Sequence, residues 1–425
     1  MRARPKILVI GGGFGGLTAV RELAGADADV LLVDRHNHHT FQPLLYQVAT
    51  AGLAAPSIAA PLRHILRDQR NVTVLLGEVR SIDVSSKQVM IDDVQHSYDY
   101  LIVATGSTHA YFGHPEWAAF APGLKTLDDA LDIRARILTA FERAESSDAP
   151  EARAAWLSFI IVGAGATGVE LAGTLAEIAR HTLRREFRRI DPSSARILLV
   201  EAGPRVLPSF PTSLSADAHR RLERLGVEVR TGQPVTEVDA RGVRIGVERV
   251  TAGTVIWAAG VAASPLGSSL GVDVDRSGRV AVTPHLNLPE HPEVFVAGDL
   301  ARVTDAPRPV PGVAPAAKQM GRHAARAILA ALAGRSAAPF RYRDYGSLAT
   351  IGRSAAVVDF GRIRLTGLLA WWVWLTAHIF FLIGFRNRLV VLIDWAQAYW
   401  TYRRGARIVI GGASTDERPA SDRFA

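Results

Sequence analysis

The stretch Lys6-Ile-Leu-Val-Ile-Gly11-Gly-Gly13-Phe-Gly-Gly16 decides the fold. Four aliphatic residues in a row are typical of a buried parallel strand, and the run changes into glycine at once. Gly11, Gly13 and Gly16 have the G-x-G-x-x-G spacing, in which the first glycine permits a tight turn and the second lets backbone approach a pyrophosphate. The third lets a helix pack against the strand. The helix expected from residue 17 to about residue 25 would direct its unpaired N–H groups at the phosphates.

A second aliphatic run, Val30–Val33, ends in Asp34, 23 residues beyond Gly11. An acid at about this spacing receives a ribose hydroxyl of a bound dinucleotide. A glycine-rich turn alone is a weak signal, but here it has a strand before it, a helix after it and an acid at the next strand end. The sequence therefore predicts a Rossmann-type dinucleotide-binding unit at the N-terminus.

The same pattern occurs a second time, and this repetition predicts two dinucleotides. Phe159–Val162 leads into Gly163, Gly165 and Gly168, and the later strand 196–200 ends in Glu201. The separation of 38 residues between Gly163 and Glu201 exceeds the usual 20 or so. We attribute the excess to an extended basic helix over residues 178–190.

Composition excludes several classes of protein. The 425 residues are 48% hydrophobic and 21% charged, with a formal charge of +8, and this length allows two or three domains with real cores. Because there is no cysteine, thiolate metal sites, disulfides and redox-active thiols are excluded, and we expect no metal site. No nucleic-acid-binding pattern accompanies the charge. The N-terminus has no apolar signal region, so we expect the nucleotide-binding domains to be cytoplasmic.

Residues 36–50 contain three histidines within four positions. A metal site is one interpretation, but no acidic or thiolate partner clusters nearby. The better interpretation is a loop and helix start that line a flavin pocket, with Pro43 and Tyr46 at its wall.

Other buried strands end in small residues or acids, which are further candidates for cofactor contacts. The strand from Tyr100 ends in Thr105 and Gly106, that from Thr254 ends in Gly260, and that from Val294 ends in Asp299. We also expect helices over 128–145, 215–225 and 314–334, and a polar, mobile loop over 145–154.

The arrangement resembles the two-dinucleotide-binding-domain flavoproteins, and within them the type II NADH dehydrogenases (NADH:quinone oxidoreductases). The similarity covers residues 7 to about 402. It rests on Val-Ile-Gly-Gly-Gly-Phe-Gly-Gly, Phe-Gln-Pro-Leu-Leu-Tyr-Gln-Val-Ala-Thr, Gly-Ala-Gly-Ala-Thr-Gly-Val-Glu-Leu-Ala and Val-Phe-Val-Ala-Gly-Asp. It implies an α/β fold with two Rossmann-type domains of the glutathione-reductase kind and a C-terminal membrane-associating helical region.

The resemblance assigns roles to individual residues. Gly11, Gly13, Gly16 and Asp34 would hold the ADP half of a non-covalent FAD, and Asp299 would bond its ribityl chain. Gly163, Gly165 and Gly168 would hold the NADH pyrophosphate. Glu201 would take the adenosine ribose hydroxyls and disfavour NADPH, although Arg205 nearby softens that preference. Glu170 resembles the glutamate that the family places beside nicotinamide and flavin; the alternative is an acid favoured by the helix dipole.

The quinone motif of the family is Ala-Gln-x-Ala-x-Gln, and here residues 314–319 are Ala-Pro-Ala-Ala-Lys-Gln. Ala314, Ala317 and Gln319 match, whereas Pro315 replaces the first glutamine. Gln319 would reach a quinone carbonyl, with Lys318 beside it. The departure at Pro315 leaves the type of quinone open.

Residues 368–385 are 18 residues long, with one histidine and no charge, and residues 389–402 form a second apolar segment. Five of the eight tryptophans fall between 371 and 400. One interpretation is a membrane-spanning helix. The other, which the family favours, is a pair of helices in the interface, with tryptophans at headgroup depth and the arginines of 368–407 on anionic lipid. A buried Asp394 is costly in a spanning helix, so we favour monotopic attachment at the cytoplasmic face of the inner membrane.

We therefore predict a non-proton-pumping NADH:quinone oxidoreductase. The alternatives are a redox-sensing protein that binds flavin and NADH, and an NAD(P)H–flavin reductase with a soluble acceptor; a homodimer stays open. The predicted domains are FAD-binding (1–112 and 282–335), NADH-binding (113–281) and membrane-anchoring (336–410), followed by a disordered tail (411–425).

Overall fold

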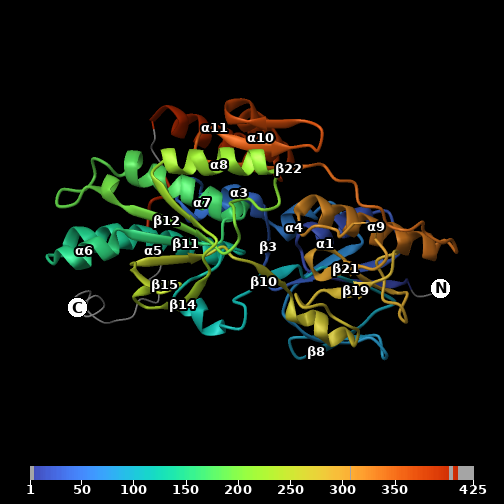
Figure 1. The fold of residues 1–425 in the computed structure, drawn as a ribbon. Helices are drawn as coiled ribbons and strands as arrows, with labels where there is room; N and C mark the ends of the chain where they lie inside the picture. The colour runs from blue at the N-terminus through green and yellow to red at the C-terminus, as the bar shows by residue number, and fades with distance from the viewer. Residues whose placement is uncertain (1–3, 307, 402–404, 410–425) are drawn as a thin grey trace. The chain divides into compact units, whose positions relative to one another are not determined.

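The computed structural model describes residues 4–306, 308–401 and 405–409. The chain forms two compact units (Figure 1). The first unit comprises Met1–Thr40, Ala59–Thr108 and Val261–Tyr345. The second comprises Phe41–Ile58, His109–Gly260 and Gly346–Ala425.

A parallel five-stranded sheet forms the centre of the first unit, with the order β20-β9-β1-β2-β5. Its strands are β1 (Lys6–Ile10), β2 (Asp29–Asp34), β5 (Val72–Leu76), β9 (Tyr100–Val103) and β20 (Val294–Val296). Aliphatic runs suit this position because a parallel sheet is covered on both faces. Helices α1 (Phe14–Glu22) and α9 (Ala314–Leu332) pack against each other. An antiparallel sheet, β6 (Val79–Asp83), β7 (Gln88–Ile91) and β8 (Val94–Ser97), adds to this unit.

The second unit repeats the plan with a parallel four-stranded sheet in the order β13-β12-β11-β17. Its strands are β11 (Ser158–Val162), β12 (Arg196–Glu201), β13 (Val227–Thr231) and β17 (Thr254–Trp257). Its main helices are α5 (Leu127–Ser146), α7 (Ala166–Glu177) and α8 (Thr212–Arg224). An antiparallel sheet of β14 (Val235–Asp239), β15 (Gly242–Ile245) and β16 (Glu248–Thr251) shares a core with the parallel sheet through Trp257 and Val255. Both Rossmann-type sheets that the sequence predicts are therefore confirmed.

The C-terminal part of the second unit is a three-stranded antiparallel sheet followed by two helices. The sheet contains β22 (Ser347–Thr350), β23 (Ala356–Asp359) and β24 (Arg364–Thr366). Helix α10 (Gly367–Phe381) packs on β23, and α11 (Phe385–Thr401) contacts α10 and α3 (Ala55–Ile58). The predicted disordered tail, 411–425, lies outside the described residues.

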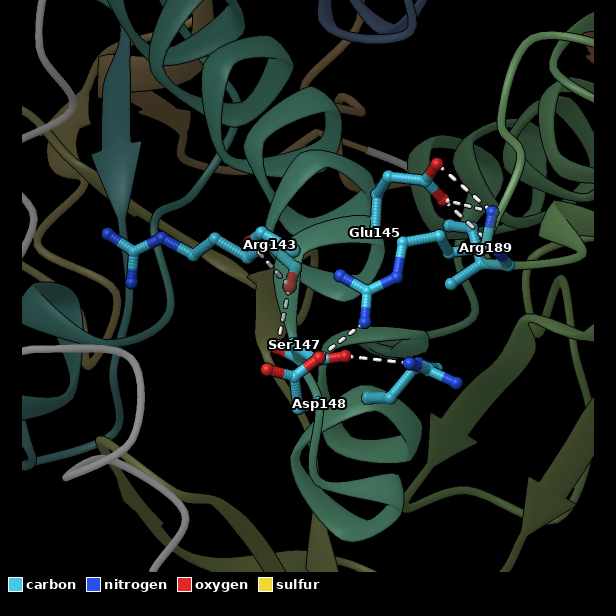
Figure 2. A network of polar contacts seen from close by, with 8 residues as sticks. Arg143, Glu145, Ser147, Asp148 and Arg189 are labelled. Carbon is cyan, nitrogen blue, oxygen red and sulfur yellow. Dashed lines mark hydrogen bonds and ion pairs between the residues drawn. The ribbon is translucent and has the colours of Figure 1, made fainter.

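Two local predictions are wrong, and a network of polar contacts joins the two segments concerned (Figure 2). Residues 145–154 are not a loop throughout, since α5 continues to Ser146 and α6 spans Pro150–Trp156. Residues 178–190 are not one helix: α7 passes into a π-helical turn at Ile178–Thr182, and no helix follows until Pro192. The Glu145 carboxylate accepts the backbone N–H groups of Arg188, Arg189 and Ile190 at 2.9–3.1 Å, and the Arg189 guanidinium pairs with Asp148. These bonds hold the basic segment in an irregular path.

The compact units group some segments differently from the predicted domain ranges. Residues 41–58 belong to the second unit, where α2 (Leu45–Ala49) packs on α5 and α7. Residues 261–281 belong to the first unit, as do residues 336–345. Which cofactor each predicted domain binds stays a prediction.

Candidate functional site

The first phosphate loop has the backbone shape that its glycines predict. Gly11 has φ of +99°, and its N–H donates to Val33 O at 2.8 Å. A Cβ at Gly16 would lie 1.8 Å from Gly11 O, so only glycine lets α1 approach the turn. A Cβ at Gly13 would meet no atom within 4 Å. The backbone at the start of α1 is thus open on the side where a pyrophosphate is expected.

Asp34 lies at the end of β2 and is bonded to this loop. Its carboxylate accepts the N–H of Gly12 at 2.6 Å and that of His36 at 2.7 Å. Burial raises the pKa of Asp34, but the hydrogen bonds from the His36 side chain and from the Gly12 and His36 backbone outweigh it, so the pKa lies below the ordinary value. Asp34 is therefore an ionised acceptor at neutral pH.

Of the three histidines in 36–39, the structure buries His39 against the same loop. His39 lies in β3 (His38–Thr40), is 2% exposed, and its Nδ1 lies 2.9 Å from Gly12 O. Because a carbonyl only accepts, Nδ1 carries the proton in this contact. Burial lowers the pKa of His39 to about 4, so the ring is neutral. Among the described residues, no group of three or more acids and histidines could hold a metal ion.

Thr105, Gly106 and Asp299 lie in the first unit with the loop. Ala104 O and the Thr105 Cα lie 2.5 and 3.3 Å from the position of a Cβ on Gly11. The Thr105 hydroxyl is buried without a hydrogen-bond partner among the described residues. Asp299, in the turn after β20, accepts the Ser107 hydroxyl at 2.7 Å. A dinucleotide needs open backbone at its pyrophosphate and polar partners for its hydroxyl groups. The open glycine, the buried Thr105 hydroxyl and the two acids meet these needs, so these residues fit FAD.

The second phosphate loop repeats these features in the second unit. Gly163 has φ of +100°, and its N–H donates to Val200 O at 2.7 Å. A Cβ at Gly165 would meet no atom within 4 Å. Glu201 accepts the N–H of Ala164 at 2.7 Å and that of Gly203 at 2.8 Å, as Asp34 does at the first loop. The turn after β17 lies close to Gly163, since a Cβ there would be 2.6 Å from Ala258 and Ala259. Gly260 closes that turn with φ of +100°.

Glu170 lies on α7, five residues beyond Gly165, and is only 8% exposed. Burial raises the pKa of its carboxyl to about 8, against a single opposing bond of 3.3 Å from the Thr350 N–H. Glu170 therefore carries a proton at neutral pH. Two turns further along α7, the Glu177 carboxylate accepts the N–H of Arg353. Both acids thus bond the backbone that joins β22 to β23.

The motif at residues 314–319 forms the first turns of α9, beside the first phosphate loop. A Cβ on Gly15 would lie 3.4 Å from Ala317 O. The Lys318 ammonium lies 5.1 Å from the centre of the Phe14 ring, and burial lowers its pKa. The Gln319 amide is occupied within the chain, since it donates to Arg343 O and accepts Arg343 N–H, both at 2.9 Å. Its predicted bond to a quinone stays a prediction and would replace or share these bonds.

Tyr46 and Pro43 belong to the second unit. Gln47 links Tyr46 to α11, because it donates to the Tyr46 hydroxyl at 2.9 Å and accepts the Trp395 indole N–H at 2.6 Å. The Trp395 ring lies 5.3 Å from Trp374, which stacks on His378 at 4.1 Å. Burial lowers the pKa of His378 to about 4. Aromatic rings with polar edges thus connect α2 to both C-terminal helices.

Large apolar side chains of α10 and α11 are exposed. Trp372 is 55% exposed and Phe380 67%. The other members of this apolar surface are Leu368, Leu369, Phe381, Leu389, Leu392 and Ile393. In the part of the chain that the structure describes, no helix has the length and apolar character needed to cross a bilayer.

Two family models together match most of the chain. Residues 5–321 match the pyridine nucleotide-disulphide oxidoreductase family, and residues 345–404 match the NDH2 C-terminal domain. The type II NADH:quinone oxidoreductase Ndh of Mycobacterium tuberculosis is 46% identical over 418 residues, which cover 95% of this chain and 89% of that protein. The chain belongs to the type II NADH:quinone oxidoreductases.

A further relative is similar over most of its length, and two solved structures share the fold. The type II enzyme of Staphylococcus haemolyticus is 30% identical, over 84% of this chain and 90% of that one. NDH2 of Plasmodium falciparum, solved with NADH, shares the fold with a TM-score of 0.87 over 96% of this chain and all of that one, at 20% identity. The sulfide:quinone oxidoreductase of Aquifex aeolicus shares the fold less closely, with a TM-score of 0.72 over 94% of this chain and 95% of that one, at 16% identity.

Several residues that contact the predicted site were not predicted. His39 lies in a histidine-rich stretch, and the pattern of that stretch does not indicate which histidine is buried. Thr350 and Arg353 meet α7 from positions about 180 residues away, and Trp395 meets Gln47 from 348 residues away. An acid close to a glycine in an apolar helix, as Glu170 is to Gly173, can indicate that the backbone of another segment packs against that helix.

Proposed function

We propose that this protein oxidises NADH and reduces a membrane quinone, with one non-covalently bound FAD per chain. The observation that carries the proposal is the pair of phosphate loops, each closed by a carboxylate that accepts an N–H of its own loop. Two such loops imply two dinucleotides. Because the chain has no cysteine, the thiol chemistry of disulphide reductases and a thioether link to flavin are both excluded.

The residues of the first unit would hold FAD. Gly13 and the N-terminus of α1 would take its pyrophosphate, Asp34 the adenosine ribose and Asp299 the ribityl chain. The Thr105 hydroxyl is a further donor for the cofactor. Bound FAD would accept two electrons from NADH as a hydride and release them to a quinone.

The residues of the second unit would bind NADH at the loop of Gly163, Gly165 and Gly168. Glu201 would accept the adenosine ribose hydroxyls and repel a 2′-phosphate. Glu170 would hold a proton in a dry site at neutral pH, available to a reacting group that gains negative charge. Gln319, with Ala314, Ala317 and Lys318, would form the quinone side.

The apolar surface of α10 and α11 supports attachment to the membrane interface. Exposed tryptophan and phenylalanine side chains bury apolar area at headgroup depth, and Arg386 and Arg388 add attraction to anionic lipid. The lengths of these helices, 15 and 17 residues, fit a position in the membrane interface better than a membrane-spanning segment. We place the protein on the cytoplasmic face, where a quinone in the bilayer and NADH in the cytoplasm are both accessible.

The two open glycines provide a matched test. A Cβ on either Gly13 or Gly165 meets no protein atom within 4 Å, so a valine at each position should fold. Gly13→Val should purify without flavin. Gly165→Val should keep FAD and be reduced by dithionite, but NADH should no longer reduce it.

Steady-state oxidation of NADH with a short-chain ubiquinone and a short-chain menaquinone completes the test. The wild-type protein should turn over with at least one of them, and Gly165→Val with neither. If Gly165→Val loses flavin and Gly13→Val keeps it, the two loops have been assigned in reverse. A colourless wild-type protein that takes up no FAD would refute the function.

A further inference from the structure

The turn from Tyr111 to His114 has an unusual residue at its tip. The His114 N–H donates to Tyr111 O at 3.0 Å, and the two central residues, Phe112 and Gly113, have φ of +51° and +95°. A turn with positive φ at both central positions favours asparagine, aspartate or glycine. Phenylalanine is strained there, because its Cβ crowds the backbone. The Phe112 side chain does not offset that strain by burial, since it is 70% exposed.

The surroundings of this turn hold it in place. The Tyr111 ring stacks on Trp257 with 5.2 Å between centres, and its hydroxyl donates to Ala121 O at 2.8 Å. The Trp257 indole N–H donates to Ala110 O at 2.9 Å. The strained residue is therefore carried on a rigid aromatic base. Strain that the surrounding structure maintains is found mainly at functional sites.

The Phe112 ring lies over the end of the turn that follows β17. A Cβ on Gly260 would come within 2.7 Å of the Phe112 Cζ, so the ring edge lies directly on that glycine. The Phe112 and Trp257 ring centres are 6.3 Å apart. Gly260 provides the space in which the Phe112 ring rests.

The order of the strands shows which half of a dinucleotide would meet this ring. In the order β13-β12-β11-β17, the phosphate loop follows β11, and Glu201 ends β12 on one side of it. The adenosine ribose belongs on the side of that acid. The nicotinamide half must then extend across the loop to the side of β17, where Ala258–Gly260 and Phe112 lie.

We propose that Phe112 is the aromatic contact for the nicotinamide ring of the bound dinucleotide, resting on Gly260 and held by the Tyr111–Trp257 stack. The proposal rests on the proposed function of the second unit as the NADH-binding unit. An exposed aromatic ring gives a flat apolar ligand ring both burial and a favourable ring–ring contact. The adenosine half, on the side of Glu201, does not contact Phe112.

The test compares two ligands that differ only on the nicotinamide side. Binding of NAD⁺ and of ADP-ribose to the FAD-loaded protein is measured by calorimetry. Phe112→Ala should weaken NAD⁺ binding about tenfold, and Phe112→Tyr should restore it to within about threefold. ADP-ribose should bind all three proteins equally. Phe360→Ala, which removes an exposed phenylalanine from the β23–β24 hairpin of the same unit, should change neither affinity.

A second variant separates binding from support of the turn. Phe112→Gly removes the backbone strain, so its melting temperature should equal or exceed that of the wild type, while its NAD⁺ affinity falls as in Phe112→Ala. The proposal is overturned if NAD⁺ binds these variants as well as the wild type, or if ADP-ribose weakens in parallel. If the wild type binds neither ligand, the failure lies in the assignment of the second unit to NADH, and the role of Phe112 falls with it.

Discussion

Replacing Glu170 with glutamine tests whether a neutral carboxyl is built into the second unit. The folded-state pKa of Glu170 is about 8, and the ordinary value is 4.5, because burial disfavours the charge. A group with a raised pKa stabilises the fold below its unfolded pKa and loses that contribution as the pH rises through the folded one. Between pH 6 and pH 9 this single group should lower the free energy of unfolding by about 3 kcal/mol. Glu170→Gln does not titrate, so it should escape this loss.

The measurement is the melting temperature of both proteins, with FAD bound, at intervals from pH 6 to pH 9. The advantage of Glu170→Gln over the wild type in melting temperature should grow by roughly 3 °C across that range, at about 1 °C per kcal/mol for a chain of this length. Every other titrating group is common to both proteins and cancels in the difference. Glu142→Gln, an exposed position on α5, is the control and should give a constant difference. Parallel curves for Glu170→Gln and the wild type would refute the buried neutral carboxyl.

Three further predictions follow from the site. Glu201→Gln should narrow the preference for NADH over NADPH by about tenfold in kcat/KM, mainly by improving NADPH use, because like charge is removed near the 2′-phosphate; a wild type that uses both equally would contradict the role of Glu201. Gln319→Leu should slow reoxidation of the flavin by quinone about tenfold and leave its reduction by NADH unchanged in stopped flow; the opposite split would contradict the assignment. Replacing Trp372, Phe380 and Phe381 with serine should weaken sedimentation with anionic vesicles even at high salt, because apolar burial is not screened. Val247→Ser, at a fully exposed valine elsewhere in the second unit, should not weaken it.

The phosphate loops were predictable because their signal is local. A strand, a glycine turn, a helix and an acid at the next strand end occupy fewer than 30 residues at the first loop, and each part has its own physical cause. Helices α5 and α9 were predictable for a similar reason, since apolar spacing and helix-forming residues extend over 19 or 20 positions. In these segments local preference and tertiary packing agree.

Where the predictions failed, contacts between distant residues decide the structure. The basic composition of 178–190 favours a helix, but the Glu145 carboxylate binds three consecutive N–H groups there from 43 to 45 residues away. These N–H groups cannot also serve in a helix, so the segment is irregular. The bonds that Gln319 makes within the chain also depend on a distant residue, since its amide bonds the Arg343 backbone 24 residues away; its bond to a quinone carbonyl stays a prediction. Motif spacing identifies a residue, but not which bonds its side chain makes.

Helix α7 connects two parts of the second unit that are far apart in the sequence, the loop at Gly163 and the C-terminal segment. Its first turn begins at the second phosphate loop, and the remainder of the helix is buried, with contacts to β22. Gly173 allows the C-terminal segment to approach closely, since a Cβ there would lie 2.8 Å from Gly352 N. Glu170 and Glu177, two turns apart on α7, then bond Thr350 and Arg353 in the segment that leads to α10. The hydrogen bond from the Thr350 N–H lowers the pKa of the Glu170 carboxyl, against the larger opposite effect of burial. The proton affinity of this carboxyl therefore depends in part on β22, which belongs to the C-terminal segment of the chain.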